Sequence, residues 1–286
     1  MLDIILDAVI DSVKLLPFLF VTYLLMEYLE HKMSEKAKNV VKKSGKWGPV
    51  LGGILGIVPQ CGFSAAAANL YAGRIITLGT LIAIFLSTSD EMLPILISEA
   101  APITTIISIL AIKVIIAIAM GLIIDFTIAQ YRKKKNESLQ EEQTIDILCE
   151  KEHCHCSEKN IVKSAIHHTI HIFLFILIIS IIINIIISII GRENISHFIL
   201  NTPIFGPMIA SIVGLIPNCA GSVILTQLYL QNLITFGSML AGLLAGNGIG
   251  ILILFRVNKN LKENMKILFM LYIIGVVCGI IIDFII

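Results

Sequence analysis

The sequence is poor in charge, since only 14% of its 286 residues are Asp, Glu, Lys or Arg. Soluble domains carry about 25% charged residues, whereas 57% of this chain is hydrophobic. This scarcity excludes an ordinary water-soluble domain and indicates a polytopic membrane protein. The net charge is +1, and no basic face lies outside short loops, so we expect no nucleic-acid partner.

Several motifs of catalysis and export are also missing. The chain has no Walker motif, no HExxH zinc pair and no nucleophile elbow, so we expect neither a nucleotide-driven pump nor an enzyme, and no cofactor. Residues 1–10 contain two Asp and no Lys or Arg, so the first apolar segment is expected to stay in the membrane. The six cysteines lie in apolar runs or crowd into one loop, unlike a secreted disulfide framework.

What the sequence does contain is an internal repeat with a shift of 158 residues. Trp47–Leu96 aligns without a gap with Phe205–Leu254, and GLIIDF at 121–126 aligns with GIIIDF at 279–284. Chance hydrophobic similarity would not align Pro, Cys, Tyr and Asp together. The identical pairs between 48 and 79 are Gly48/Gly206, Pro49/Pro207, Gly56/Gly214, Pro59/Pro217, Cys61/Cys219, Ser64/Ser222, Leu70/Leu228, Tyr71/Tyr229, Ile76/Ile234, Thr77/Thr235 and Gly79/Gly237.

The apolar runs and the positive loops predict the topology. A spanning helix needs about 20 apolar residues. The loops at 32–46, 132–135 and 256–266 are rich in Lys and Arg and are therefore expected in the cytoplasm. The apolar runs lie at about 4–27, 47–72, 75–98, 103–128, 164–190, 205–230, 233–255 and 267–286.

Three apolar runs between the first two cytoplasmic loops cannot all span, because an odd number would not return the chain to the same side. The run 47–72 holds Gly and Pro residues that interrupt a helix, so it is the candidate for a re-entrant hairpin. The same argument makes 205–230 a hairpin entering from the outer face. Both termini are then expected outside.

These patterns predict an all-α polytopic membrane protein of two inverted-topology repeats. Each repeat has three spanning helices and one re-entrant hairpin, which gives about ten membrane segments. We expect the first repeat at 1–130, a cytoplasmic linker at 131–162 and the second repeat at 163–286. Inverted repeats with broken helices are typical of secondary transporters.

The hairpin tips GIVPQCGFS and GLIPNCAGS are candidates for a central ion site. Irregular backbone at membrane depth must face protein or a water-filled cavity. Thiolate favours soft or borderline ions, trivalent arsenicals among them, whereas carboxyl and carbonyl oxygens favour harder cations such as manganese. Packing by small buried residues is the alternative explanation of these tips. The candidate substrate-binding residues at the tips are Gln60, Cys61, Ser64, Asn218, Cys219 and Ser222.

Polar residues inside other apolar runs are further candidates. Asp90 and Glu91 interrupt one run, and Asn247 lies in the corresponding stretch of the second half; the two carboxylates are expected to bind the ion or couple transport, unless they are solvated at the outer mouth. Lys113 lies deep in a span, with an intramembrane acid or the interface as its expected partner. Weaker coupling candidates, each an i, i+3 pair on one helix face, are Asp11 with Lys14 and His168 with His171.

The polar linker carries alternating Cys and His residues, CEKEHCHC at 149–156. Tandem neighbours rarely ligate one ion in a tetrahedral site, so this segment is expected to capture metal loosely, or to be an incidental polar linker. The candidate metal ligands in the linker are Cys149, His153, Cys154, His155 and Cys156.

The motifs VPQCGFSAAAANLYAGRIITLGTL, FLSTSDEMLPIL and IPNCAGS resemble the bacterial ten-transmembrane heavy-metal exporter family, labelled arsenic efflux protein or manganese transporter. The similarity covers nearly the whole chain. It implies efflux of a metal or metalloid ion across a bacterial plasma membrane. The residues leave two alternatives open: transport of a thiol-reactive sulfur compound or other small anion, and a membrane metal sensor that uses the Cys/His linker. We expect a proton or cation gradient to drive transport, and the lipid bilayer to surround the protein.

Overall fold

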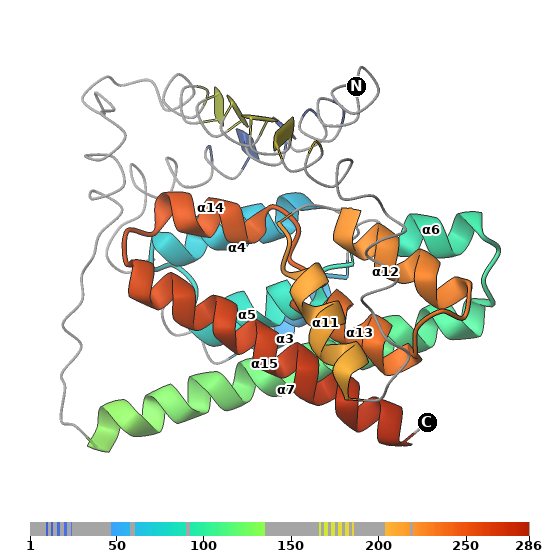
Figure 1. Cartoon of the computed structure of the whole chain (residues 1–286). Coiled ribbons are helices and arrows are strands. Elements are labelled where there is room, and N and C mark those ends of the chain that lie inside the picture. The colour runs from blue at the N-terminus through green and yellow to red at the C-terminus, as the bar shows by residue number, and fades with distance from the viewer. Residues whose placement is uncertain are drawn as a thin grey trace.

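The computed structural model describes residues 47–57, 61–89, 92–134, 204–217 and 220–285, with isolated helical positions within 10–24 and 166–185. These residues form α-helices joined by short turns and breaks (Figure 1). The helices of the first half are α3 (Gly48–Leu55), α4 (Cys61–Ala72), α5 (Leu78–Ser87), α6 (Met92–Ser98) and α7 (Ile103–Lys134). Those of the second half are α11 (Phe205–Gly214), α12 (Ala220–Leu230), α13 (Phe236–Ala245), α14 (Gly250–Val257) and α15 (Leu261–Ile285).

The helices follow the 158-residue repeat of the sequence. Helices α5 and α13 begin and end at equivalent positions, and α7 and α15 begin at equivalent positions. The turns after α4 and α12 also match, because Arg74 and Asn232 have φ values of 58° and 57°. Within the described residues, each half therefore contains equivalent helices in the same order.

Two runs that the sequence analysis treated as single spans are broken helices. The run 75–98 contains α5 and α6, and the run 233–255 contains α13 and α14. The first break begins at Thr88, whose backbone is extended, with ψ of 129°. The second contains Gly248 in the left-handed region, with φ of 51°, which glycine adopts without steric cost. Helix α7 continues beyond 128 to Lys134, and α15 begins at Leu261 rather than at 267.

Two aspartates cap the helices that precede these breaks. Thr77 Oγ1 donates to Asp125 Oδ2 at 2.6 Å, and Gly79 N donates to Asp125 Oδ1 at 2.8 Å. The second half repeats this arrangement: Thr235 Oγ1 donates to Asp283 Oδ2 at 2.6 Å. A carboxylate at a helix N-terminus accepts hydrogen bonds from the free N–H groups of the helix and interacts favourably with the positive end of the helix dipole. Asp125 and Asp283 are thus structural caps.

Glycines bring the capped helices into close contact. A Cβ added at Gly79 would lie 2.2 Å from Gly121 O, and one added at Gly237 would lie 2.3 Å from Gly279 O. No real side chain tolerates such distances, so α5 packs on α7, and α13 on α15, through glycine backbones. The repeated glycines in the sequence mark these two helix contacts.

The two halves exchange contacts across their interface. Helix α4 packs along α14 of the other half, and α12 packs against α6 (Figure 1). A Cβ added at Gly250 would lie 2.7 Å from Ser64 Cβ, so the start of α14 touches α4 directly. Helices α4 and α12 therefore each lie on the helix that follows the break of the opposite half.

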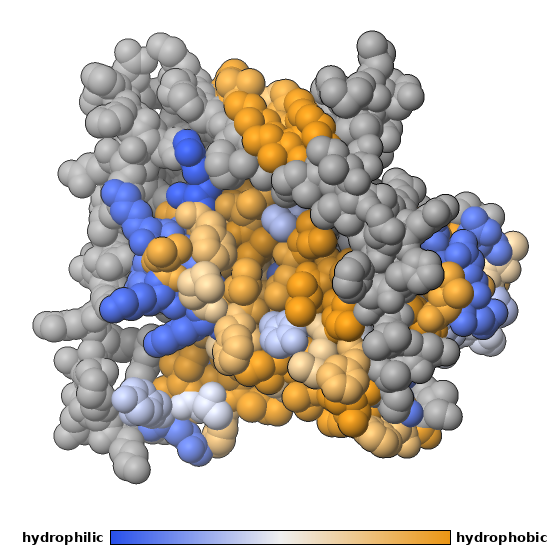
Figure 2. Space-filling model, in the orientation of Figure 1, coloured by the Kyte–Doolittle hydropathy of each residue, from blue (hydrophilic) through white to orange (hydrophobic). Residues whose placement is uncertain are grey.

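The outer surface is strongly apolar, and Figure 2 shows a hydrophobic central band with hydrophilic residues gathered at its left and right. Large exposed apolar side chains lie along α7 and α15, among them Ile115, Phe126, Phe269 and Phe284. Soluble monomers rarely expose such patches. Within the described residues, three stretches are long and apolar enough to cross a membrane: Ile103–Tyr131, Phe236–Val257, counted through its break, and Leu261–Ile285.

The matched caps give a stability prediction. Asp125→Ala and Asp283→Ala should lower the thermal unfolding midpoint of the purified protein in detergent by similar amounts, because each removes two hydrogen bonds from a helix N-terminus. At about 1.5–3 kcal/mol for each bond to a charged group, each shift should reach several degrees. Glu99→Ala, in an exposed turn, is the control and should leave the midpoint unchanged. A lower unfolding midpoint in only one of the two aspartate variants would contradict the equivalence of the two caps.

Candidate functional site

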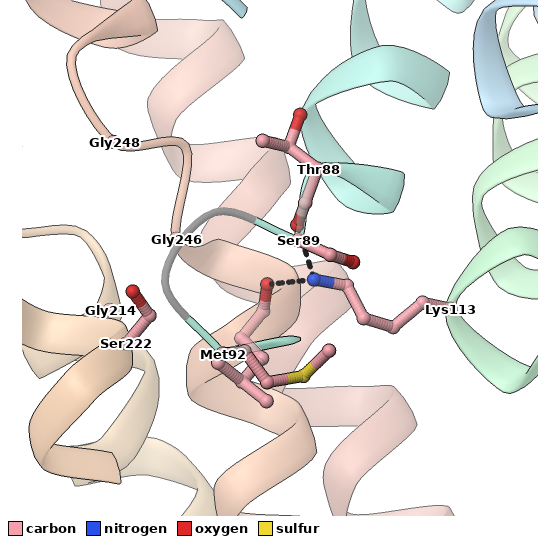
Figure 3. Close-up of a pocket in the computed structure, with 9 residues that line it drawn as sticks. Thr88, Ser89, Met92, Lys113, Gly214, Ser222, Gly246 and Gly248 are labelled. Atoms are coloured by element: carbon pink, nitrogen blue, oxygen red, sulfur yellow. Dashed lines mark hydrogen bonds between the residues drawn. The ribbon is translucent and has the colours of Figure 1, made fainter. Parts of the chain in front are cut away.

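The two helix breaks meet around a small polar cavity, which the end of α11 and the start of α12 also line (Figure 3). The cavity volume is about 10 Å³, which is close to the volume that one water molecule needs. Residues from both halves line it: Thr88, Ser89, Met92, Lys113, Gly214, Ser222, Leu243, Gly246 and Gly248. The cavity is thus of the size of a water molecule or a single ion and lies where the halves join.

Lys113 brings a positive charge to this cavity. The side chain is 1% exposed, although it starts from the middle of α7. Its Nζ donates to Thr88 O at the first break and to Leu243 O, 3.1 Å away, near the second (Figure 3). Both of these acceptors are main-chain carbonyls, one from each half. The predicted pairing of Lys113 with an intramembrane acid stays a prediction, because Asp90 and Glu91 lie outside the described residues.

Asn247 is a second unusual polar residue; it lies between Gly246 and Gly248, which line the cavity, but is not itself a lining residue. It lies in the break between α13 and α14 and is 2% exposed. Within the part of the chain that the structure describes, neither Nδ2 nor Oδ1 has a hydrogen-bond partner. A buried amide left unsatisfied costs about 1–3 kcal/mol, and such groups in native proteins call for an explanation. Asn247 is therefore available to a ligand.

The hydroxyl candidates Ser64 and Ser222 occupy equivalent places on α4 and α12. Ser222 lines the cavity, whereas Ser64 is fully buried against Gly250. Cys61 is the first residue of α4. Other candidates of the sequence analysis lie outside the described residues: Gln60, Asn218, Cys219, Asp90, Glu91, Asp11, Lys14, His168, His171, Cys149, His153, Cys154, His155 and Cys156.

No group of three or more His, Cys, Asp or Glu side chains lies together in the ranges that the structure describes. The residues that it does bring to the cavity supply an ammonium, hydroxyls, a thioether and a leucine, with backbone groups of three glycines. Thr88 and Ser89 hydroxyls already donate to Ile84 O and Ser87 O, at 2.7 Å and 3.0 Å. Their oxygens keep the capacity to accept.

An ion pair that the sequence analysis missed joins the two halves away from the cavity. Arg74, in the turn after α4, donates to both carboxylate oxygens of Glu263 in the first turn of α15, at 2.9 Å and 3.1 Å. Tyr71 also donates its hydroxyl to Glu263. The turn between α4 and α5 therefore lies beside the turn between α14 and α15, both at the left of Figure 1.

The sequence could locate only part of this arrangement. A lysine within an apolar run is itself a signal, and it pointed to Lys113 without showing its partners. Arg74 and Glu263 are far apart in the chain and occur in loops where charge is common, so no local pattern links them. The importance of Ser89 and Gly246 depends on the helix breaks, which the apolar runs concealed.

The chain was compared with known protein families, with curated proteins and with solved structures. No curated protein and no solved structure matches it. The family described as "Putative, 10TM heavy-metal exporter" matches residues 1–198 and 184–286, which together include every position of the chain. The resemblance to the ten-transmembrane heavy-metal exporter family is thereby confirmed, and the chain belongs to this family of multi-span membrane proteins.

Proposed function

We propose that this protein is a secondary transporter that exports a metal or metalloid ion across the bacterial plasma membrane by alternating access. The ion is manganese or another divalent cation, or an arsenical, and it binds between the two halves. The observation that carries this proposal is the buried amide of Asn247 at a helix break, which has no hydrogen-bond partner among the described residues. A bound ion or its hydration water would satisfy that amide.

The broken helices support a binding site at this depth. A break frees backbone carbonyl and amide groups, which apolar surroundings tolerate only where protein or a polar cavity satisfies them. Broken helices that meet between two repeats supply such groups in secondary transporters. Thr88 and Gly246, at the two breaks, line one cavity, so one small ion could contact both halves.

The proposed ligands combine soft and hard donors. Cys61 and Cys219 would supply thiolates from the hairpin tips, with Gln60 and Asn218 beside them, while Ser64 and Ser222 would add hydroxyl oxygens. Asp90 and Glu91 fall between Ser89 and Met92, which are both buried, and would bind the ion or couple its movement to a gradient. Asp11, Lys14, His168 and His171 stay weaker coupling candidates, and the 149–156 segment a candidate for metal capture.

An inverted arrangement of the repeats would provide the two alternating states. The Arg74 and Glu263 ion pair supports it, because a turn of the first half lies beside a non-equivalent turn of the second. Helix α7 also runs from right to left in Figure 1, whereas its counterpart α15 runs from left to right. Halves of opposite orientation can exchange conformations and thereby expose a shared site to either face.

The inversion can be tested by labelling single cysteines in a chain whose native cysteines are replaced. Pro102→Cys and Asn260→Cys occupy exposed positions that are equivalent in the repeat. A membrane-impermeant maleimide should label Pro102→Cys in intact cells but should reach Asn260→Cys only after permeabilisation. Gln231→Cys, also exposed, should behave like Pro102→Cys. Labelling of Pro102→Cys and Asn260→Cys from one side would contradict the inversion.

The thiol ligands can be tested with inside-out vesicles. Cys61→Ser and Cys219→Ser should each reduce uptake of a thiophilic ion such as arsenite or zinc by about tenfold or more, which corresponds to about 1.4 kcal/mol of lost binding. Cys278→Ser changes a half-buried cysteine on α15 and should leave uptake unchanged. Unaltered uptake of every thiophilic ion in the two hairpin variants would exclude thiolates from the site.

Asn247 offers a test that separates binding from folding. Asn247→Leu should abolish uptake while leaving the thermal unfolding midpoint unchanged or raised, because replacing an unsatisfied buried amide with an apolar group removes a cost. The matched control is Asn69, which is equally buried, at 2% exposed, but donates to Ala65 O at 3.1 Å. Asn69→Leu should lower the midpoint. If Asn247→Leu lowered it as much, Asn247 would have a structural role.

A further inference from the structure

We propose that the Lys113 ammonium acts as a tethered monovalent cation at the two helix breaks, in the place where a broken-helix transporter would hold Na⁺. This inference rests on the proposed function and concerns its coupling. It predicts that the protein needs no Na⁺ and that removing the lysine side chain creates a site for a small monovalent cation.

The first carbonyl that Lys113 contacts belongs to the end of α13. That helix stops at Ala245, and the Gly246 N–H still bonds to Gly242 O at 2.8 Å. The carbonyls of a helix's last turn lack intrahelical partners, and Leu243 lies in this last turn. Lys113 Nζ donates to Leu243 O at 3.1 Å. The ammonium therefore satisfies a carbonyl that the break exposes.

The second carbonyl comes from the other half. Thr88 is the C-cap of α5, where that helix unwinds, and its O accepts from Lys113 Nζ. The C-terminal end of each helix carries partial negative charge. Two such ends, of α5 and α13, thus face one ammonium. In transporters with broken helices, unwound carbonyls and half-helix C-termini coordinate Na⁺ or H⁺.

The second half has no lysine at the position equivalent to Lys113. The residue equivalent to Lys113 in the second half is Leu271, which is fully buried on α15. If position 113 served only for packing, a leucine would be expected there as well, because burying a charge is costly unless it is paired. Charged residues retained inside a membrane protein are functional candidates by default. One ammonium serves both breaks because they meet at the same cavity.

The ammonium already occupies the position between the two carbonyls, Thr88 O and Leu243 O. A free monovalent cation could bind these two carbonyls only by displacing the ammonium. Na⁺ should therefore not bind at these carbonyls in the native chain. Removing the side chain would leave the carbonyls for another cation.

The test measures the thermal unfolding midpoint of the purified full-length protein in detergent. The native protein should have the same midpoint in sodium and choline chloride at equal ionic strength. Lys113→Ala should unfold several degrees lower and should recover with methylammonium at tens of millimolar, because a ligand of the folded state stabilises it. Tetramethylammonium, which is too large for the cavity, should not rescue. Lys113→Met, which fills the space without a charge, should not be rescued by either cation.

Two outcomes would overturn the proposal. One is a native protein whose unfolding midpoint or vesicle transport differs between sodium chloride and choline chloride. This measurement uses only the native protein, so it tests the proposal even if Lys113→Ala fails to fold. The other is a folded Lys113→Ala that responds to neither methylammonium nor sodium. The midpoint needs no transported substrate, so rescue without transport of any tested ion would contradict the exporter proposal and leave the role of Lys113 intact.

Discussion

Backbone groups freed at the helix breaks are the constraint on which the rest of the structure depends. In an apolar interior each such group must find a partner, and a break in only one half would leave its groups facing hydrocarbon. Here the two breaks meet, and Lys113 donates to a carbonyl from each. The packing of α4 on α14 and of α12 on α6 brings the breaks together. The cavity is a consequence of this arrangement.

The repeat preserves the scaffold and varies the site. Residues identical in both halves hold the helices in place: Gly79 and Gly237 allow close packing, and Thr77 and Thr235 bond to the capping aspartates. Around the cavity the equivalent residues differ, since Ser89 corresponds to Asn247 and Lys113 to Leu271. An ion bound between the halves would therefore have different ligands on its two sides, which a symmetric fold can provide only through unequal side chains.

The sequence predicted the scaffold better than the site. The 158-residue shift follows from matching Gly, Pro and Asp, and the described helices start at matching positions because those residues determine where helices begin, end and touch. The breaks that begin at Thr88 and Gly246 were less visible, because hydropathy averages a few polar residues into a long apolar run. Partners such as Leu243 O for Lys113 are backbone atoms, and no side-chain pattern can identify them in advance.

The ion pair between Arg74 and Glu263 has a consequence for transport under the inverted arrangement proposed above. Its counterparts in the repeat are Asn232 and Thr105, which cannot form an ion pair. With equal halves, the two access states would be equal in free energy, so any bias must come from residues that differ between them. Arg74 and Glu263 are partly buried, at 29% and 21% exposed, and a bidentate arginine contact is among the stronger hydrogen-bonded pairs. This contact favours the state in which the halves touch at the α4–α5 turn. Because a ligand shifts such an equilibrium only by its different affinities for the two states, the cavity must bind its ion more tightly in the other state to open this face.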